Sequence, residues 1–345
     1  METLWFFLLA WVLFTYVVLD GFDLGAGVCH LFVARTPAER RQVLASVGPV
    51  WDGNEVWLVV AGGTMFAVFP KLLATSFSGF YLPLMIVLWL LVFRALSIEL
   101  HHHVASRLWT QFWDVAFAVS STLLIVCLGA ALGNVVRGVP LDESGTFFVP
   151  LWSDFRVGGV TGVLDWYTLL VAATALLALT HHGALWLLSK TDGPVAERAQ
   201  SLASRLLLPL LLAVVALTAV SFTVQPLALE HLTARPWGAV FPVLALLALG
   251  ATHRWRATGR FTAAFVASGM FLYGLLASAA VGLFPYVLPA RDPAYGLTVT
   301  DVASRSETLS GALSWWLPGM ALACVYVVIV MRCMPATYHV DDEGH

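Results

Sequence analysis

The chain has 345 residues, of which 59% are hydrophobic and only 11% are charged, and its mean hydropathy is +0.84. Ordinary soluble domains carry roughly 25% charged residues, so this composition excludes a soluble fold. The net charge of -3 gives no reason to expect nucleic-acid binding. The four cysteines form no Cys-x-x-Cys pair of the kind typical of a metal site or a redox dithiol.

Nine stretches of the chain are long and apolar enough to cross a bilayer. A spanning helix takes roughly 20 mostly apolar residues, because in hydrocarbon every backbone polar group must be satisfied within the segment. The predicted helices cover residues 4–29, 49–69, 75–99, 112–136, 164–188, 202–224, 237–252, 262–284 and 309–332. The first lacks a basic leading segment and continues past Val18 without a small-residue cleavage site, so we expect a retained helix and no signal peptide.

These segments predict an all-α integral membrane protein with a single transmembrane domain. Residues 1–137 are expected to form a first four-helix group, residues 164–285 a second, and residues 286–345 a ninth, peripheral helix with its tail. The longest connection, 138–163, carries Pro, Gly and acidic residues and is expected to be a solvated loop rather than a second domain. We expect the tail after Arg332, which ends in Asp341, Asp342 and Glu343, to be a disordered cytoplasmic end.

Basic residues indicate the orientation, because Lys and Arg concentrate on the cytoplasmic side of short loops. Of the 18 Lys and Arg residues, 12 follow odd-numbered helices or sit at their inner ends, which leaves six on the other side. Those six are Lys71, Arg137, Arg156, Arg235, Arg291 and Arg305. The sequence therefore predicts an N-terminus outside, a C-terminus in the cytoplasm, and the loop 138–163 outside.

Two pairs of acidic residues lie inside the first two predicted helices. Asp20 and Asp23 are three residues apart and share one helix face, and Asp52 and Glu55 repeat this spacing on the second helix. Each charge within a membrane helix costs roughly 2.5–3.5 kcal/mol on insertion scales, so the cluster calls for a functional explanation. With the predicted orientation both pairs lie toward the cytoplasm, where mutually repelling carboxylates in a low dielectric could relay protons.

Three more charged residues, Arg94, Glu99 and Asp114, border the next cytoplasmic loop at a similar depth. They are candidates for the proton entrance or for a counter-charge to the acidic pairs. Together with those pairs they suggest proton uptake from the cytoplasm.

A structural alternative exists for the acidic pairs, because carboxylates at a helix N-terminus cap the helix or pair with an arginine at little cost. It applies most to Asp52 and Glu55, since Pro49 suits the first position of the second helix. A proton or ion role is favoured for both pairs, and more strongly for Asp20 and Asp23, which lie well inside the first helix.

Aromatic and small residues accompany the acidic pairs. Trp51 and Trp57 flank the second pair and could line a narrow apolar passage, although aromatic residues near a membrane interface are commonly belt residues. The glycines of the first two helices are expected to permit close helix packing. They are Gly21, Gly25 and Gly27 in the first helix and Gly62 and Gly63 in the second.

Histidines are scarce within the apolar segments, although a membrane b-type cytochrome needs inward-facing His or Met ligands. Only the adjacent His181 and His182 lie within a predicted helix, and neighbours on a helix point about 100° apart, so the two cannot bracket one haem. Either histidine could be a single axial haem ligand, but a polar contact with another group of the protein is the favoured role. The chain by itself therefore does not look like a redox subunit, and we expect neither catalytic residues nor a metal site in it.

Several motifs follow one another in the first half of the chain. They are VLDGFDLGAG at 18–27, ERR at 39–41, GPVWDGNEVWLVVAGG at 48–63, FSGFYLPL at 77–84, FRALSIEL at 93–100, FWD at 112–114 and GNVVRGVP at 133–140. Together they resemble the N-terminal half of subunit II of the cytochrome bd quinol oxidase family. The resemblance covers roughly the first 165 residues well, and beyond them it rests on helix number and length.

The resemblance implies one subunit of a heterodimeric terminal oxidase of the bacterial cytoplasmic (inner) membrane, which oxidises quinol and reduces oxygen to water. Two b-type haems and one d-type haem would belong to the larger subunit I, and this chain would not be catalytic alone. A small single-helix accessory subunit and a structural quinone are further candidates for the complex.

The resemblance also implies routes for protons and oxygen through this subunit. Asp23 and Asp52 match family positions assigned to proton transfer, and Trp57 matches the aromatic residue at the oxygen entrance. Asp20 and Glu55 are assigned to the proton path from their spacing on the two helices.

Two other classes of membrane protein compete with this interpretation. An ion- or proton-coupled secondary transporter would place acids near helix centres and interrupt helices in both halves of the chain, whereas these acids cluster on one side and in one half. A haem-bearing cytochrome b membrane anchor would need paired buried histidines, which the sequence lacks.

Overall fold

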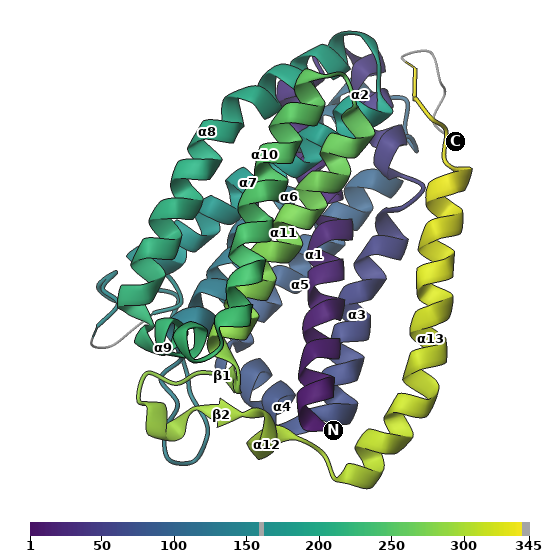
Figure 1. The fold of residues 1–345 in the computed structure, drawn as a ribbon. Helices are drawn as coiled ribbons and strands as arrows, with labels where there is room; N and C mark the ends of the chain where they lie inside the picture. The colour runs from purple at the N-terminus through teal and green to yellow at the C-terminus, as the bar shows by residue number, and fades with distance from the viewer. Residues whose placement is uncertain (159–161, 340–345) are drawn as a thin grey trace.

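The computed structural model describes residues 1–158 and 162–339 and is nearly all helical (Figure 1). Within these residues, eight helical segments are long and apolar enough to span a membrane. They are α1 (Glu2–Val33), α5 (Tyr81–Glu99), α6 (Arg107–Arg137), α7 (Trp166–Lys190), α8 (Gly193–Val224), η1 (Pro236–Ala239) with α10 (Val240–Ala257), α11 (Phe261–Leu283) and α13 (Ser306–Cys333). The predicted all-α membrane fold is confirmed.

A ninth candidate span is a broken one, because α3 (Trp51–Val68) and α4 (Pro70–Gly79) meet at an angle of 120°. Pro70 lacks an N–H and disfavours helical geometry at the residue before it, so the chain turns at Phe69. The prediction of one straight helix over 75–99 is wrong at its start. Residues 75–79 belong to α4, and the spanning helix begins at Tyr81.

Shorter elements join the spans. They are α2 (Pro37–Val47), α9 (Pro226–Ala234), β1 (Tyr286–Leu288), η2 (Pro293–Tyr295), β2 (Leu297–Thr298) and α12 (Val299–Val302). α2 begins with a capping box in which Thr36 and Glu39 satisfy each other's backbone N–H groups, and Pro37 occupies its first turn. β1 and β2 form a short antiparallel pair, and a bridge from Val139 to Ala290 ties the start of the long loop to this region.

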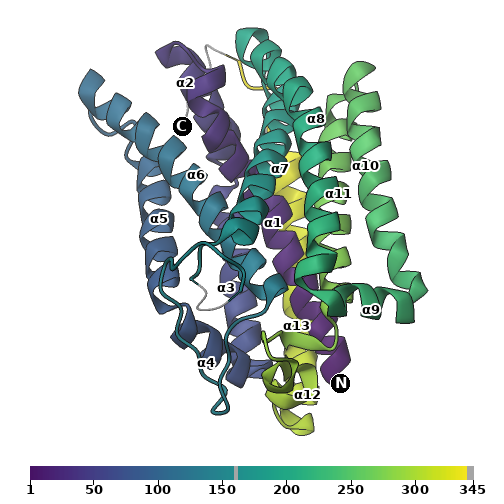
Figure 2. The same ribbon diagram turned by 90° about the vertical axis from the view of Figure 1, so that its left-hand side faces the viewer.

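α1 lies at the centre of the bundle, where it packs against α3, α6, α7 and α11 (Figure 2). Its crossing with α7 is closest at two glycines. A Cβ on Gly25 would lie 2.0 Å from the backbone oxygen of Leu179, and one on Gly183 would lie 2.2 Å from the backbone carbon of Gly25. Glycine at both positions therefore lets the two backbones touch, as predicted for the glycines of the first helix.

The glycines of α3 behave differently. Apart from their chain neighbours and the backbone of their own helix, no atom of the described chain lies within 4 Å of a Cβ built on Gly62 or Gly63. The prediction that they permit close packing is wrong within this chain, because these two positions of α3 face away from the other helices.

α13 lies at the edge of the bundle and packs against α3 (Figure 1). The chain after it does not match the expected disordered tail. The backbone N–H of Tyr338 donates to the Lys190 carbonyl (2.7 Å), and the Gln42 amide donates to the Tyr338 carbonyl (2.7 Å). Residues 334–339 are thus held against α2 and the turn between α7 and α8, whereas Asp341, Asp342 and Glu343 lie outside the described residues.

The division into two four-helix groups stays a prediction. α6 and α1 from the first predicted group pack against α7 from the second about as extensively as helices pack within each group. The orientation of the chain in the membrane also stays a prediction. The N-terminus and the end of α13 lie at opposite ends of the molecule (Figure 1), as the odd number of predicted spans requires.

Candidate functional site

One face of α1 carries most of its polar residues. Tyr16, Asp20, Asp23, Gly27 and His30 are spaced by four, three, four and three residues, which places them on one stripe of the helix. All but the glycine carry polar side chains, and each of these is buried. The stripe extends over about 21 Å of helix, at 1.5 Å per residue, and ends near the predicted cytoplasmic side.

Arg94 of α5 is the centre of a buried charge cluster. Its Nη1 lies 2.6 Å from Asp20 Oδ1, and its Nη2 donates to Glu55 Oε2 of α3 (3.0 Å). Arg94 and Asp20 are fully buried, whereas the Glu55 side chain keeps 23% of its surface exposed. The cluster thus joins α1, α3 and α5 and reaches the outer face of α3 through Glu55.

Asp23 lies one turn further along the same stripe of α1. Its Oδ2 accepts a hydrogen bond from the Asn54 amide (2.7 Å), while its Oδ1 has no hydrogen-bond partner among the described residues. A buried carboxyl group with one oxygen unsatisfied within the chain is costly unless water or a partner reaches it. Asp23 is therefore a candidate for exchanging a proton rather than only for holding helices together.

Asp52 and Glu99 do not join this cluster. Asp52 is exposed in the first turn of α3, and Glu99 is exposed at the last residue of α5. Within the described chain, no hydrogen bond or ion pair connects either residue to Arg94, and α3 has no side-chain cap. The expected convergence of four carboxylates is therefore reduced to Asp20, Asp23 and Glu55, because helix α3 turns Asp52 away from α1.

Asp114 of α6 forms a second buried cluster. Its Oδ1 accepts from His30 Nε2 (2.8 Å) and His101 Nε2 (3.0 Å), and its Oδ2 accepts from Arg40 Nη1 (2.6 Å). These partners come from α1, the α5–α6 loop and α2, so Asp114 fastens four segments at one end of the bundle. The sequence identified Asp114 as a candidate but not its histidine partners, because His30 lies 84 residues away and His101 lies in a loop whose direction the sequence pattern does not define.

Trp57 lies inside the protein with 4% of its surface exposed. Its ring meets Trp11 edge to face at 5.6 Å between centroids, and Trp11 in turn meets Trp316 of α13 at 6.3 Å. Trp57 is thus part of the apolar core between α1, α3 and α13 rather than a belt residue at the lipid surface.

His182 makes polar contacts with both of its ring nitrogens. Nδ1 lies 2.5 Å from Ser268 Oγ, and Nε2 lies 3.0 Å from the Val18 carbonyl oxygen. The ring also stacks on Phe265 at 4.7 Å between centroids. An imidazole with both nitrogens engaged has no lone pair left for iron, so His182 does not fit haem ligation. His181 is buried beside it.

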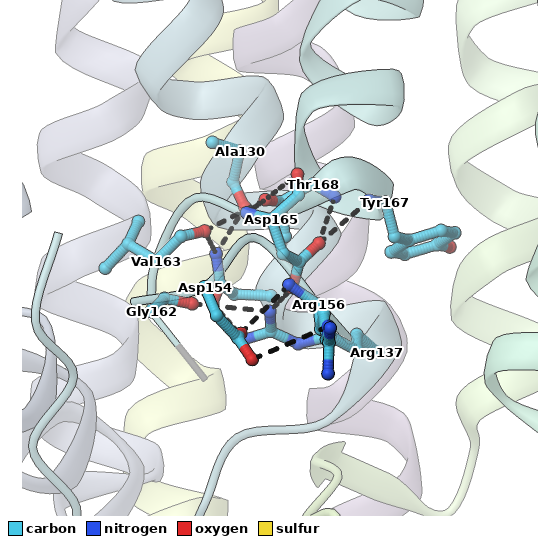
Figure 3. A network of polar contacts seen from close by, with 10 residues as sticks. Ala130, Arg137, Asp154, Arg156, Gly162, Val163, Asp165, Tyr167 and Thr168 are labelled. Carbon is cyan, nitrogen blue, oxygen red and sulfur yellow. Dashed lines mark hydrogen bonds and ion pairs between the residues drawn. The ribbon is translucent and has the colours of Figure 1, made fainter. Parts of the chain in front are cut away.

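A third polar network lies at the opposite end of the bundle and was not anticipated (Figure 3). Arg137, the last residue of α6, is buried, pairs with Asp165 and donates to Asn134 Oδ1 (2.6 Å) and to the Gly162 carbonyl (3.3 Å). Asp165 also caps α7 by accepting from the backbone of Tyr167 and Thr168. This network attaches the end of the long loop to α6 and α7.

Glu39 of the ERR motif anchors α2 to α8. Its Oε2 accepts from Arg198 Nη1 (2.8 Å) and from the backbone N–H of Arg35 (2.6 Å). Burial opposes ionisation, but these hydrogen bonds outweigh it and hold the pKa of Glu39 below its ordinary value. No grouping of three His, Cys, Asp or Glu residues within 1–158 and 162–339 has a geometry that could hold a metal ion.

The fold and these clusters define a polytopic helical membrane protein with buried charges between its helices. Comparisons with known proteins identify its family: the model described as Cytochrome bd terminal oxidase subunit II matches residues 1–334. The chain therefore belongs to the family of cytochrome bd terminal oxidase subunit II. The match extends well beyond the first 165 residues, so the second half of the chain also matches this family.

Characterised relatives agree with this assignment. The chain is 29% identical to the cytochrome bd-I ubiquinol oxidase subunit 2 of Escherichia coli K12, over 95% of this chain and 90% of that protein. It is 29% identical to the cytochrome bd ubiquinol oxidase subunit 2 of Bacillus subtilis 168, over 90% and 88%. It is a multi-pass protein of the cytoplasmic (inner) membrane.

Among solved structures, a chain of the bd oxidase from Geobacillus thermodenitrificans has the same fold. It superposes with a TM-score of 0.77 at 19% identity, covering 96% of this chain and 97% of that one. At this identity the likeness establishes the helical architecture, and residue roles rest on the contacts described above.

Proposed function

We propose that this chain is the haem-free subunit of a heterodimeric quinol:oxygen oxidoreductase and supplies protons to the oxygen-reducing haems of its partner, subunit I. Two b-type haems and one d-type haem are assigned to subunit I from the family resemblance, and the engagement of both ring nitrogens of His182 with protein groups supports a haem-free role for this chain. Quinol is the expected substrate, as the names of the E. coli and B. subtilis relatives indicate. An accessory single-helix subunit and a structural quinone remain candidates for the complex.

The observation that carries the proton role is the buried carboxylates on the polar stripe of α1. Reduction of oxygen to water consumes protons, and these must cross part of the membrane to reach a buried haem. Asp20 and Asp23 provide acceptors in the bilayer interior, and Glu55 connects the cluster with the outer face of α3. Asp52, exposed one turn before Glu55, would be the residue at which protons are exchanged with the surroundings or with the partner.

Arg94 acts in this proposal as the fixed counter-charge. It makes charged forms of Asp20 and Glu55 tolerable in the bilayer, since an unpaired carboxylate there is expensive. Glu99 would lie near the cytoplasmic mouth. An oxygen route past Trp57 is proposed from the family resemblance alone, and the packing of Trp57 against Trp11 makes it a wall of such a route rather than an open entrance.

The alternative of an ion-coupled transporter has one observation in its favour, the broken α3–α4 pair. The break lies at Phe69, however, whereas Asp52 and Glu55 lie in the first two turns of α3, at its other end. In a transporter the unwound backbone and the acids would line the same binding site, so this geometry favours the oxidase subunit.

The test is the substitution Asp23→Asn in the intact oxidase complex. We expect oxygen consumption to fall about tenfold or more, because the asparagine fills the same space but cannot carry a proton. The haem absorption spectra should remain normal. Asp52→Asn should slow turnover in the same way if Asp52 is the exchange residue. Unchanged turnover in both variants, with only a loss of stability, would show that the carboxylates are structural.

A further inference from the structure

A histidine-rich loop lies at the end of the polar stripe of α1 that is predicted to face the cytoplasm. His101, His102 and His103 occupy the connection between α5 and α6. His101 is buried with 4% of its surface exposed, while His102 and His103 are exposed. The loop therefore places one titratable group inside the protein directly beside two that face water.

From His102 a continuous chain of polar contacts leads inward. The Nδ1 atoms of His102 and His101 lie 3.4 Å apart, His101 Nε2 lies 3.0 Å from Asp114 Oδ1, and the same oxygen lies 2.8 Å from His30 Nε2. His30 is fully buried and lies on the polar stripe of α1, seven residues from Asp23. Two helical turns, about 10.5 Å of rise, separate the two residues along one helix face.

The interval between His30 and Asp23 is lined by unsatisfied polar atoms. Asp23 Oδ1, Ser121 Oγ and His30 Nδ1 are all buried without a hydrogen-bond partner among the described residues. Ser121 of α6 lies against α1 at Gly27, between the other two, since a Cβ on Gly27 would lie 2.1 Å from Ser121 Oγ. Buried polar atoms of this kind are normally bridged by ordered water.

We infer that His102, His101, Asp114 and His30 form a proton relay that collects protons at the α5–α6 loop and passes them along α1 to Asp23. The inference rests on the proposed proton role of Asp23 and names the entrance that supplies it. Ser121, with water, would complete the connection from His30 to Asp23.

The protonation states that the contacts require are consistent with such a relay. His102 takes a proton from solvent and passes one from its Nδ1 to Nδ1 of His101, which then releases its Nε2 proton to Asp114. At rest His30 carries its proton on Nε2, which donates to Asp114. Once Asp114 is protonated, His30 exchanges to its Nδ1–H tautomer, its Nε2 accepts the Asp114 proton, and its Nδ1 proton leaves toward Ser121 and Asp23, which restores the resting tautomer. One proton enters and one leaves, and each imidazole is reset by exchanging its tautomer.

Charged groups surround the relay along its length. Arg40 lies 2.6 Å from Asp114 Oδ2 and, with the two histidines, keeps that carboxyl ready to return to its charged form. Partial desolvation and the neighbouring His101, Arg41 and His103 lower the pKa of His102, so its imidazole is mostly neutral near neutral pH and can accept a proton. Further inward, Asp20, Glu55 and Arg94 surround the receiving end.

A structural clamp is the competing explanation, because the Asp114 contacts also hold α1, α2 and α6 together. A substitution at the exposed end of the relay distinguishes the relay from the structural clamp. His102→Gln removes a surface imidazole without disturbing the buried contacts of Asp114, so a purely structural cluster would tolerate it. His103→Gln, in the same loop and also exposed, is the matched control.

The experiment measures quinol-driven oxygen consumption of the intact oxidase complex between about pH 6 and 8, with haem spectra to verify assembly. We expect His102→Gln to lose up to about tenfold in turnover at the alkaline end, where free protons are scarce, and less at the acidic end. Added imidazole should restore the rate, and His103→Gln should behave like the unmodified complex. His101→Gln should reproduce the defect if the complex assembles.

Equal pH profiles for His102→Gln and His103→Gln, without an effect of imidazole, would overturn the relay. If Asp23→Asn were still slow in that case, the proposed function would stand and protons would enter elsewhere, for example through Asp52 and Glu55. If Asp23→Asn were also fully active, both the proton role of this chain and the relay would be wrong.

Discussion

At the scale of single residues, Arg94 is the most informative position. It is completely buried between Asp20 and Glu55, and such a group is stable in a bilayer only while its charge is paired. The geometry of the pair with Asp20 is that of a close ion pair rather than of an aligned hydrogen bond. Coulomb attraction therefore carries more of this contact than directional bonding does.

Arg94→Gln should be strongly destabilising, by about 3–5 kcal/mol, because it leaves two carboxylates without their counter-charge. The triple variant Asp20→Asn, Glu55→Gln, Arg94→Gln removes all three charges together and should recover part of this loss. Thermal unfolding of the purified complex in detergent measures both. Equal stability of the single and triple variants would show that the pairing contributes little.

At the scale of the helices, the crossing of α1 with α7 positions the polar stripe. Gly25 and Gly183 bring the two backbones into contact on one side of α1. The opposite side, with Asp20 and Asp23, is thereby directed toward α3 and α5, where Asn54 and Arg94 meet it. Small residues on one face of a helix thus decide which partners the acidic residues on another face reach.

Gly183→Ala should push α1 away from α7 and lower stability by about 1–3 kcal/mol, the usual cost of overpacking a tight contact. Gly250→Ala is the matched control, since α10 leaves space within 4 Å of that position. There the substitution should be neutral or stabilising by up to about 1 kcal/mol, because alanine favours helix. A similar shift in the melting temperature of both variants would contradict the close crossing.

At the scale of the whole molecule, the orientation in the membrane decides the source of the protons. The polar stripe, the Asp114 cluster and the histidine loop all lie toward the end of the bundle that the distribution of Lys and Arg predicts to be cytoplasmic. The Arg137 network lies at the other end, where α6 finishes. If the orientation were inverted, the relay would draw protons from outside.

Labelling of single cysteines tests the orientation. In a background without the four native cysteines, Ser144→Cys in the long loop should react with a membrane-impermeant maleimide in intact cells. Thr258→Cys, exposed between α10 and α11, should react only after the membrane is permeabilised. Labelling of Thr258→Cys, but not of Ser144→Cys, in intact cells would show that the predicted orientation is inverted.

The membrane class and the number of spans were predictable from the sequence, because hydrophobicity over a window of about 20 residues is a local property. The acidic pairs were predictable for the same reason, since charges stand out in apolar segments. The docking of residues 334–339 was not, because it depends on contacts with distant parts of the chain.

Which charges meet was decided only by the tertiary structure. By their spacing alone, Asp52 and Asp20 were equally good candidates for the buried acidic cluster. The rotation of α3 about its axis, however, exposes Asp52 and turns Asn54 toward Asp23. His30, His101 and Asp114 are separated by up to 84 residues and meet only because α1 and α6 pack side by side. A sequence pattern indicates the face of a helix on which a residue lies, whereas helix packing determines which residue of another helix that residue meets.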